Sequence, residues 1–79
     1  MIKAEVAVYP LKTNSASGVI NNSIDSLNNH NINYRVGSTH TEITGSTDDV
    51  FNSLQTMFSE AERIGGEINM VVTISNASE

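Results

Sequence analysis

Apolar residues alternate with other residues in four short stretches of the chain. The clearest stretch is at the N-terminus, where Ile2, Ala4, Val6 and Val8 are separated by less apolar neighbours. Successive side chains of a strand point to opposite faces, so this pattern predicts half-buried β-strands. We expect four of them, over residues 2–9, 32–37, 39–44 and 68–74.

Between these strands, apolar residues recur at the three- and four-residue spacing of an amphipathic helix. The first such pattern predicts a helix over about 17–29, with Ser15 or Ser17 as its N-cap. The second predicts a longer helix over about 48–64, which the pair Gly65-Gly66 ends. The apolar stripe of the second helix consists of Val50, Phe51, Leu54, Met57, Phe58, Ala61 and Ile64.

The resulting order is strand, helix, strand, strand, helix, strand. Two split β-α-β units of this kind fold most simply as a ferredoxin-like α+β sandwich. We expect one domain over residues 1–79, with a four-stranded antiparallel sheet in spatial order four-one-three-two and both helices on one face. On the opposite, open face, Glu5 and Glu42 are expected on adjacent strands.

Composition limits the partners of this domain. The chain has 79 residues and a net charge of −5, and its four strong bases are scattered. This charge argues against nucleic acid and against an anionic membrane as partners. A domain this small buries little surface, so we expect a homo-oligomer, a dimer or a tetramer. No apolar run reaches membrane-spanning length and no signal-peptide pattern opens the chain, so we expect a soluble, cytoplasmic protein.

Catalytic and metal-binding signatures are not evident. The chain has no cysteine, and neither His30 nor His40 falls in a metal-binding or catalytic spacing. We therefore expect no catalytic residue, no metal and no cofactor.

Two threonines make the third strand unusual. If Ile43 faces the helices, alternation sends Thr39 and Thr41 to the same face, which should be apolar. In one interpretation their methyl groups pack and their hydroxyls bond to the backbone. In the other they floor a small cleft between sheet and helix, with Ser17 and the 12–16 loop at its mouth, suited to a small uncharged or weakly basic heterocycle.

Several stretches resemble one known family in the same order along the whole chain. These are Val-Ala-Val-Tyr-Pro-Leu from Val6, the helix opening at Ser17, Thr-x-Ile-x-Gly from Thr41, Asp-Asp-Val-Phe from Asp48, and Val-Val-Thr-Ile from Val71. They are similar to the YkoF-like proteins, which bind thiamine or hydroxymethylpyrimidine. The resemblance implies a ferredoxin-like fold, dimers or tetramers, and binding of thiamine or its pyrimidine precursor without catalysis.

The resemblance places Thr41 and Ser17 on the family's strand-three threonine and helix-opening serine. Hydroxyls of Ser17, Ser38, Thr39 and Thr41 would then read the ring nitrogens and amine, and Tyr9 would stack on a ring if the pocket reaches the open face. The alternative is a regulatory ligand-sensing domain of the amino-acid-binding type. An acylphosphatase-type enzyme would need an arginine in the loop after the first strand, and residues 10–17 contain none.

Overall fold

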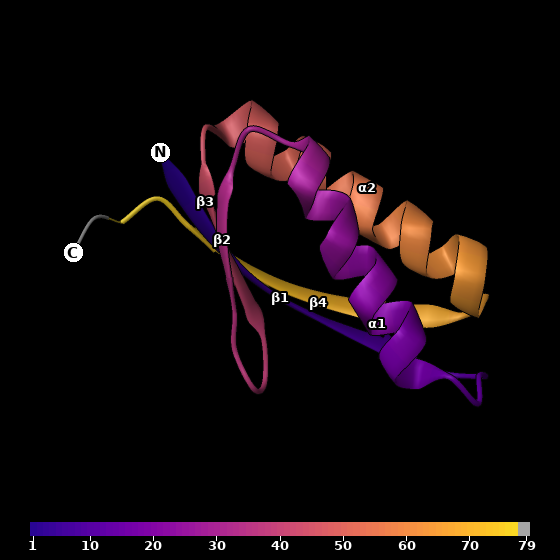
Figure 1. The fold of residues 1–79 in the computed structure, drawn as a ribbon. Helices are drawn as coiled ribbons and strands as arrows, with labels where there is room; N and C mark the ends of the chain where they lie inside the picture. The colour runs from indigo at the N-terminus through magenta and orange to yellow at the C-terminus, as the bar shows by residue number, and fades with distance from the viewer. Residues whose placement is uncertain (78–79) are drawn as a thin grey trace.

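The computed structural model describes residues 1–77 and confirms the predicted order of strands and helices. The elements are β1 (Ile2–Pro10), α1 (Ala16–Asp25), the short 3-10 helix η1 (Ser26–Asn29), β2 (Asn33–Val36), β3 (Thr41–Gly45), α2 (Thr47–Gly65) and β4 (Ile68–Ser75). Helices α1 and α2 pack against each other and cover one face of the sheet (Figure 1). The molecule is therefore a two-layer sandwich with one open sheet face.

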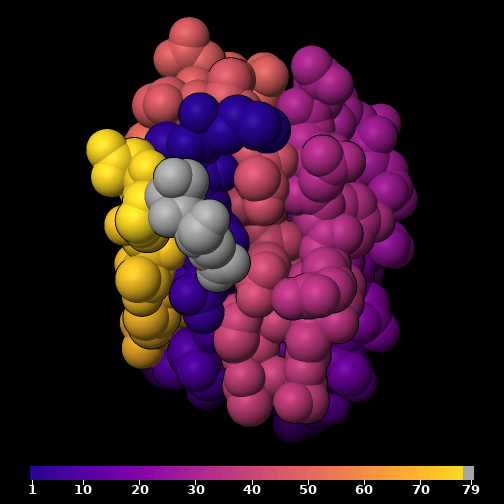
Figure 2. Space-filling view, turned by 90° about the vertical axis from the view of Figure 1, so that its left-hand side faces the viewer, coloured from indigo at the N-terminus to yellow at the C-terminus, as the bar shows by residue number. Residues whose placement is uncertain are grey.

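The sheet is antiparallel and has the order β2-β3-β1-β4, as expected from the sequence. Glu5 on β1 lies opposite Glu42 on β3 and Thr73 on β4. Figure 2 shows the open face, where the strands form neighbouring columns in the order β4, β1, β3, β2. The two carboxylates predicted on adjacent strands are thus direct cross-strand neighbours.

The core lies between the sheet and the helices because alternation directs one apolar side of each central strand toward α1 and α2. Its buried members are Ala4, Val6, Val8, Val19, Leu27, Ile43, Val50, Leu54, Met57 and Ala61. Burying a valine or leucine side chain stabilises a fold by about 1.5–3 kcal/mol. This layer supplies the main stabilisation of the domain.

The apolar stripe of α2 is wider than the surface available to cover it. Phe51, Phe58 and Ile64 are 51%, 38% and 40% exposed, so these three members of the predicted stripe lie outside the core. The buried line along α2 runs through Val50, Leu54, Met57 and Ala61. A helix packed on a sheet buries only one side of its surface, and these three residues lie beside that side.

The ends of the helices follow from local chemistry. The Ser46 side chain caps α2 by accepting a hydrogen bond from the amide of Asp49 at 3.1 Å. Gly66 follows the helix with a positive φ of 75°, a conformation that glycine adopts at low cost. At α1 the N-cap residue is Ser15, one of the two predicted, but its side chain makes no capping bond.

No helix within residues 1–77 has the length and hydrophobicity needed to cross a membrane.

Candidate functional site

The central strand β1 is longer than its pairing with β3. The ladder between them ends at the pair Val6–Thr41, whereas β1 continues to Pro10 paired with β4 alone. Beyond Thr41 the β2–β3 hairpin turns away from β1 and β4 (Figure 1). We call this divergence of the strands the fork and define it by residues 7–10 of β1 and residues 37–41 of the hairpin. In an antiparallel ladder, alternate residues direct their backbone groups to one neighbour, so part of this β1 segment offers hydrogen-bonding groups to the fork.

Thr41 lies at the apex of the fork and is 5% exposed. The other buried hydroxyls, those of Ser23, Ser26 and Ser53, donate to carbonyl oxygens three residues earlier, at 2.8, 2.6 and 2.7 Å. Within residues 1–77 the Thr41 hydroxyl has no such partner. No fully buried side-chain oxygen of these residues lacks a partner, so this hydroxyl retains contact with solvent. It therefore has hydrogen-bonding capacity that the described residues do not use.

The hairpin turn forms the second side of the fork. The Gly37 amide donates to the His40 carbonyl at 2.9 Å, which closes the turn and leaves Ser38 and Thr39 exposed at its tip. Strand β3 consequently begins at Thr41. The prediction that Thr39 shares the buried face with Thr41 is wrong, because alternation does not continue through a tight turn.

His40 connects this turn to β1 on the open face. Its Nε2 lies 3.1 Å from a carboxylate oxygen of Glu5, and its Nδ1 lies 3.1 Å from the hydroxyl oxygen of Thr39. A carboxylate only accepts hydrogen bonds, so Nε2 carries a proton, and in the neutral imidazole the Thr39 hydroxyl donates to Nδ1. The turn folds His40 onto a strand thirty-five positions away, which its spacing in the sequence does not indicate.

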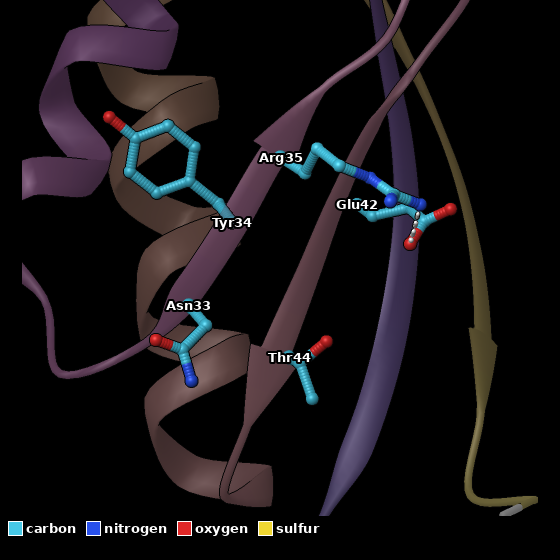
Figure 3. A pocket seen from close by; sticks show the side chains of 5 residues that line it. All are labelled: Asn33, Tyr34, Arg35, Glu42 and Thr44. Carbon is cyan, nitrogen blue, oxygen red and sulfur yellow. Dashed lines mark hydrogen bonds and ion pairs between the residues drawn. The ribbon is translucent and has the colours of Figure 1, made fainter.

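A row of charged side chains crosses the open face beside the fork. Arg35 on β2, Glu42 on β3 and Glu5 on β1 occupy one line of the register. The guanidinium Nη2 of Arg35 lies 3.3 Å from Glu42 Oε1 (Figure 3). Like charges directly opposite each other destabilise a sheet. The guanidinium of Arg35 offsets part of this repulsion at Glu42.

Two surface hollows accompany this row. One has a volume of about 330 Å³ and is lined by Arg35, Gly37, Ser38, Thr39, His40 and Glu42. The other, of about 280 Å³, is lined by Asn33, Tyr34, Arg35, Glu42 and Thr44 (Figure 3). In Figure 3 Tyr34 points away from Arg35, toward the helices, and its hydroxyl donates to the side-chain oxygen of Asn28 at 2.7 Å. The hairpin thus lines hollows on the open face.

The five predicted ligand-binding residues divide into groups. Ser38 and Thr39 lie together at the turn, and Thr41 lies next to them at the fork apex. Tyr9 is 53% exposed on the open face of β1, beyond the last β1–β3 pair. Ser17 is exposed in the first turn of α1, on the helix side, and lines neither hollow. Four of the five, Tyr9, Ser38, Thr39 and Thr41, therefore belong to the segments that define the fork. Ser17 lies apart from them in the helical layer.

Residues 1–77 contain no group of three or more histidine, aspartate or glutamate side chains placed to hold a metal ion. The chemistry that the site offers is hydrogen bonding by hydroxyls and attraction of positive charge.

The fold defines the protein as a small ferredoxin-like α+β sandwich, and solved structures share it. A hypothetical protein, MJ1052, of Methanocaldococcus jannascii superimposes with a TM-score of 0.87 at 18% identity, over 99% of this chain and 81% of its own. SP2199 of Streptococcus pneumoniae gives 0.91 at 19% identity, over 98% and 87%. TM0486 of Thermotoga maritima, a candidate thiamine biosynthesis or salvage protein, gives 0.84 at 16% identity, over 96% and 83%.

At these identities the structural likeness shows the fold alone. The sequence, however, matches the YKOF-related family over residues 1–79, and the chain belongs to that family. No curated protein sequence matches it.

Proposed function

We propose that this protein binds thiamine or its hydroxymethylpyrimidine precursor at the fork, without catalysing a reaction. The observation that carries the proposal is the Thr41 hydroxyl, which lies on an otherwise apolar face without a partner among residues 1–77. Membership of the YKOF-related family and the likeness to a candidate thiamine biosynthesis or salvage protein support a thiamine-related ligand.

The chemistry of the ligand suits the groups around the fork. An aminopyrimidine presents ring nitrogens that accept and an exocyclic amine that donates, and a threonine or serine hydroxyl can do both. Thr41 would form the floor, with Ser38 and Thr39 at the hairpin side. Tyr9 would stack on a ring from β1, and Ser17 would close the helix side only if the ligand reached α1.

Charge adds a preference for thiamine over its neutral precursor. The thiazolium ring of thiamine is cationic, and the protein has a net charge of −5. The carboxylates of Glu5 and Glu42 are on the face next to the fork. Because exposed charges are screened by salt, this preference should weaken as ionic strength rises.

The Thr39 hydroxyl, the His40 imidazole and the Glu5 carboxylate form a chain of contacts at the site, to which we assign a structural role and not a catalytic one. Thr39 and His40 are adjacent residues in an exposed turn, and the hydroxyl contacts Nδ1. We propose that this chain holds the turn against Glu5. It would position the hairpin side of the fork for the ligand.

Calorimetric titration and thermal shift test the proposal directly. Wild-type protein should bind thiamine, its phosphates or the pyrimidine. At a hundred times the dissociation constant, the ligand should stabilise the fold by about 2.7 kcal/mol. If none of these compounds produces heat or a shift in melting temperature, the proposed function is wrong.

The Thr41→Val variant tests the site. Valine keeps the shape and removes the hydroxyl, so the free protein should melt at the wild-type temperature. Loss of one neutral hydrogen bond costs about 0.5–1.5 kcal/mol, so we expect a several-fold loss of affinity. Thr47→Val, an exposed residue at the start of α2 that lines neither hollow, is the matched control and should bind normally. Equal affinities of wild type and Thr41→Val would show that Thr41 only packs in the core and does not bind the ligand.

A further inference from the structure

Arg35 is the strong base that lines the hollow at the hairpin turn. The same hollow, of about 330 Å³, contains Ser38 and Thr39, two of the hydroxyl residues proposed to bind the ligand. The Arg35 side chain is 79% exposed, so packing does little to fix it. Its guanidinium Nη2 instead lies 3.3 Å from Oε1 of Glu42 (Figure 3). A bound ligand would therefore lie beside this ion pair.

The sheet register keeps the two charged groups together. Arg35 on β2 is directly opposite Glu42 on β3, and side chains of such a pair leave the sheet on the same face. The Glu42 side chain is 29% exposed, so the carboxylate is the better fixed of the two. A guanidinium has five N–H donors, and the contact with Glu42 uses one nitrogen. Arg35 thus has donors that could bind a phosphate, but Glu42 neutralises its charge.

A second carboxylate makes the surroundings of the hollow negative. Glu5 lies opposite Glu42 on the other side and is 3.1 Å from Nε2 of His40. The second carboxylate oxygen of Glu42 is 3.9 Å from the same nitrogen. With a neutral imidazole, two carboxylates therefore stand against one guanidinium. The side chains at one hollow act on a ligand inside it, because salt screens charges over about 8 Å at physiological ionic strength.

The other strong bases lie elsewhere in the described part of the chain. Lys12 and Arg63 form ion pairs with carboxylates outside this hollow, the second of them on α2. Lys3 lies near the start of β1, whereas the fork is at the other end of that strand. A phosphate group in the hollow at the turn would therefore depend on Arg35 for its positive partner.

We propose that the Arg35–Glu42 ion pair determines ligand specificity, because it withholds Arg35 from the ligand and so excludes phosphate esters. A phosphate ester carries a charge of about −1.5 to −2 at neutral pH. Such a group meets the negative charge of Glu5 and Glu42, whereas a cation or a neutral alcohol does not. Specificity is a difference of affinities, and repulsion of the wrong ligand contributes to it. This inference rests on the proposed function and deepens it: the site takes unphosphorylated thiamine or pyrimidine and rejects the phosphorylated forms.

Calorimetric titration with thiamine and with thiamine monophosphate tests the specificity. Wild type should bind thiamine several-fold more tightly than the monophosphate. Glu42→Gln keeps the shape, removes the charge and releases Arg35, so it should bind the monophosphate more tightly than wild type does. Adding Arg35→Gln to that variant should abolish the gain, because the phosphate then has no guanidinium to contact. Glu62→Gln makes the same change of charge on α2, outside this hollow, and should keep the wild-type ratio of affinities.

The outcomes separate this inference from the proposed function. If wild type binds thiamine and its monophosphate equally well, or if Glu42→Gln leaves the ratio of the two affinities unchanged, the inference is wrong and the proposed function stands. If wild type binds neither compound nor the pyrimidine, both are wrong. The preference of wild type should also shrink as ionic strength rises, since exposed charges are screened by salt. A preference that stayed constant in high salt would not come from the ion pair and would overturn the inference.

Discussion

Val6 on β1 lies directly opposite Thr41 on β3, and this is the last pair that joins the two strands within the described residues. The hairpin turn begins immediately beyond it on the β3 side, since Val36 on β2 also pairs with Thr41. Because the turn closes at His40, directly before Thr41, β3 cannot pair with the rest of β1. The fork is therefore a direct consequence of the position of Gly37 and His40 in the chain.

Gly37 is the residue on which the hairpin side of the fork depends. A Cβ atom added there would lie 2.9 Å from the carbonyl oxygen of His40, which is backbone and cannot move aside alone. We expect Gly37→Ala to shift the turn, to separate His40 from Glu5, and to lower affinity for thiamine. The fold should lose about 1–3 kcal/mol, the usual cost of overpacking. Calorimetric titration and urea unfolding measure the two effects.

Gly18→Ala is the matched control for that experiment. The nearest atom to its added Cβ is Ser15 Cβ at 3.8 Å, an ordinary contact. Since glycine inside a helix costs about 0.5–1 kcal/mol relative to alanine, this variant should be more stable than wild type and bind equally well. Gly37→Ala with wild-type affinity would show that the turn does not form part of the site.

Much of the fold was predictable because each strand and each helix has a single clear spacing of apolar residues. Alternation in β1 and β4 fixes which side chains face the helices, and the glycine pair after α2 fixes where that helix ends. The strand order and the placement of Glu5 opposite Glu42 then follow from topology. These features depend on local patterns that are visible in a single sequence.

The site was less predictable because it depends on where strand alternation and strand pairing end. Thr39, Thr41 and Ile43 alternate, but alternation does not reveal that pairing ends at Thr41 and that Thr39 belongs to the turn. The contact between His40 and Glu5 likewise requires the geometry of the turn. The exposure of Phe51 depends on how much of α2 the sheet can cover, which hydrophobic spacing does not report.

The two serines that precede the helices predict different outcomes for the same substitution. Ser46 accepts a hydrogen bond from the Asp49 amide, whereas Ser15 occupies the N-cap of α1 without one. Ser46→Ala should lower the free energy of unfolding by about 0.5–2 kcal/mol, the usual range for a lost cap. Ser15→Ala should have a smaller effect. Urea unfolding of both variants compares them, and equal losses would contradict the difference in capping.

Gly65 predicts an energetic coupling between the two helices. Its added Cβ would lie 3.1 Å from both methyl carbons of Val19, which is fully buried. Valine is stiff about χ1, so Gly65→Ala should destabilise the fold by about 1–3 kcal/mol. Combining it with Val19→Ala removes those methyl groups, and the double variant should lose less than the sum of the two single losses.

Gly66→Ala is the control for this coupling. No atom lies within 4 Å of its added Cβ, but its φ is 75°, so its cost comes from the backbone. A non-glycine residue in a sparsely populated backbone conformation costs roughly 1–3 kcal/mol. Val19→Ala should not relieve that cost. Additive losses for Gly65→Ala and Val19→Ala would show that the helices have room to move apart.

An ion pair between Glu60 and Arg63 in the last turns of α2 should make a pH-dependent contribution to the stability of the fold. Arg63 donates from Nε and Nη2 to the two carboxylate oxygens of Glu60, at 3.2 and 2.7 Å. The hydrogen bond from Arg63 holds the pKa of Glu60 below its usual value. A carboxyl group whose pKa is lower in the folded state stabilises the fold above its unfolded pKa. That contribution is lost as the pH falls through its folded pKa.

Glu60→Gln removes the charge and leaves the shape. The variant should melt slightly below wild type at neutral pH and low salt, and the difference should shrink in high salt, because both side chains are solvent-accessible. It should vanish in acid, where wild-type Glu60 is also neutral. Glu62→Gln is the control, since Glu62 forms no ion pair within residues 1–77, and it should melt at the wild-type temperature at neutral pH. A melting difference for Glu60→Gln that persisted unchanged in acid could not arise from the ion pair, because no carboxylate remains there to attract Arg63.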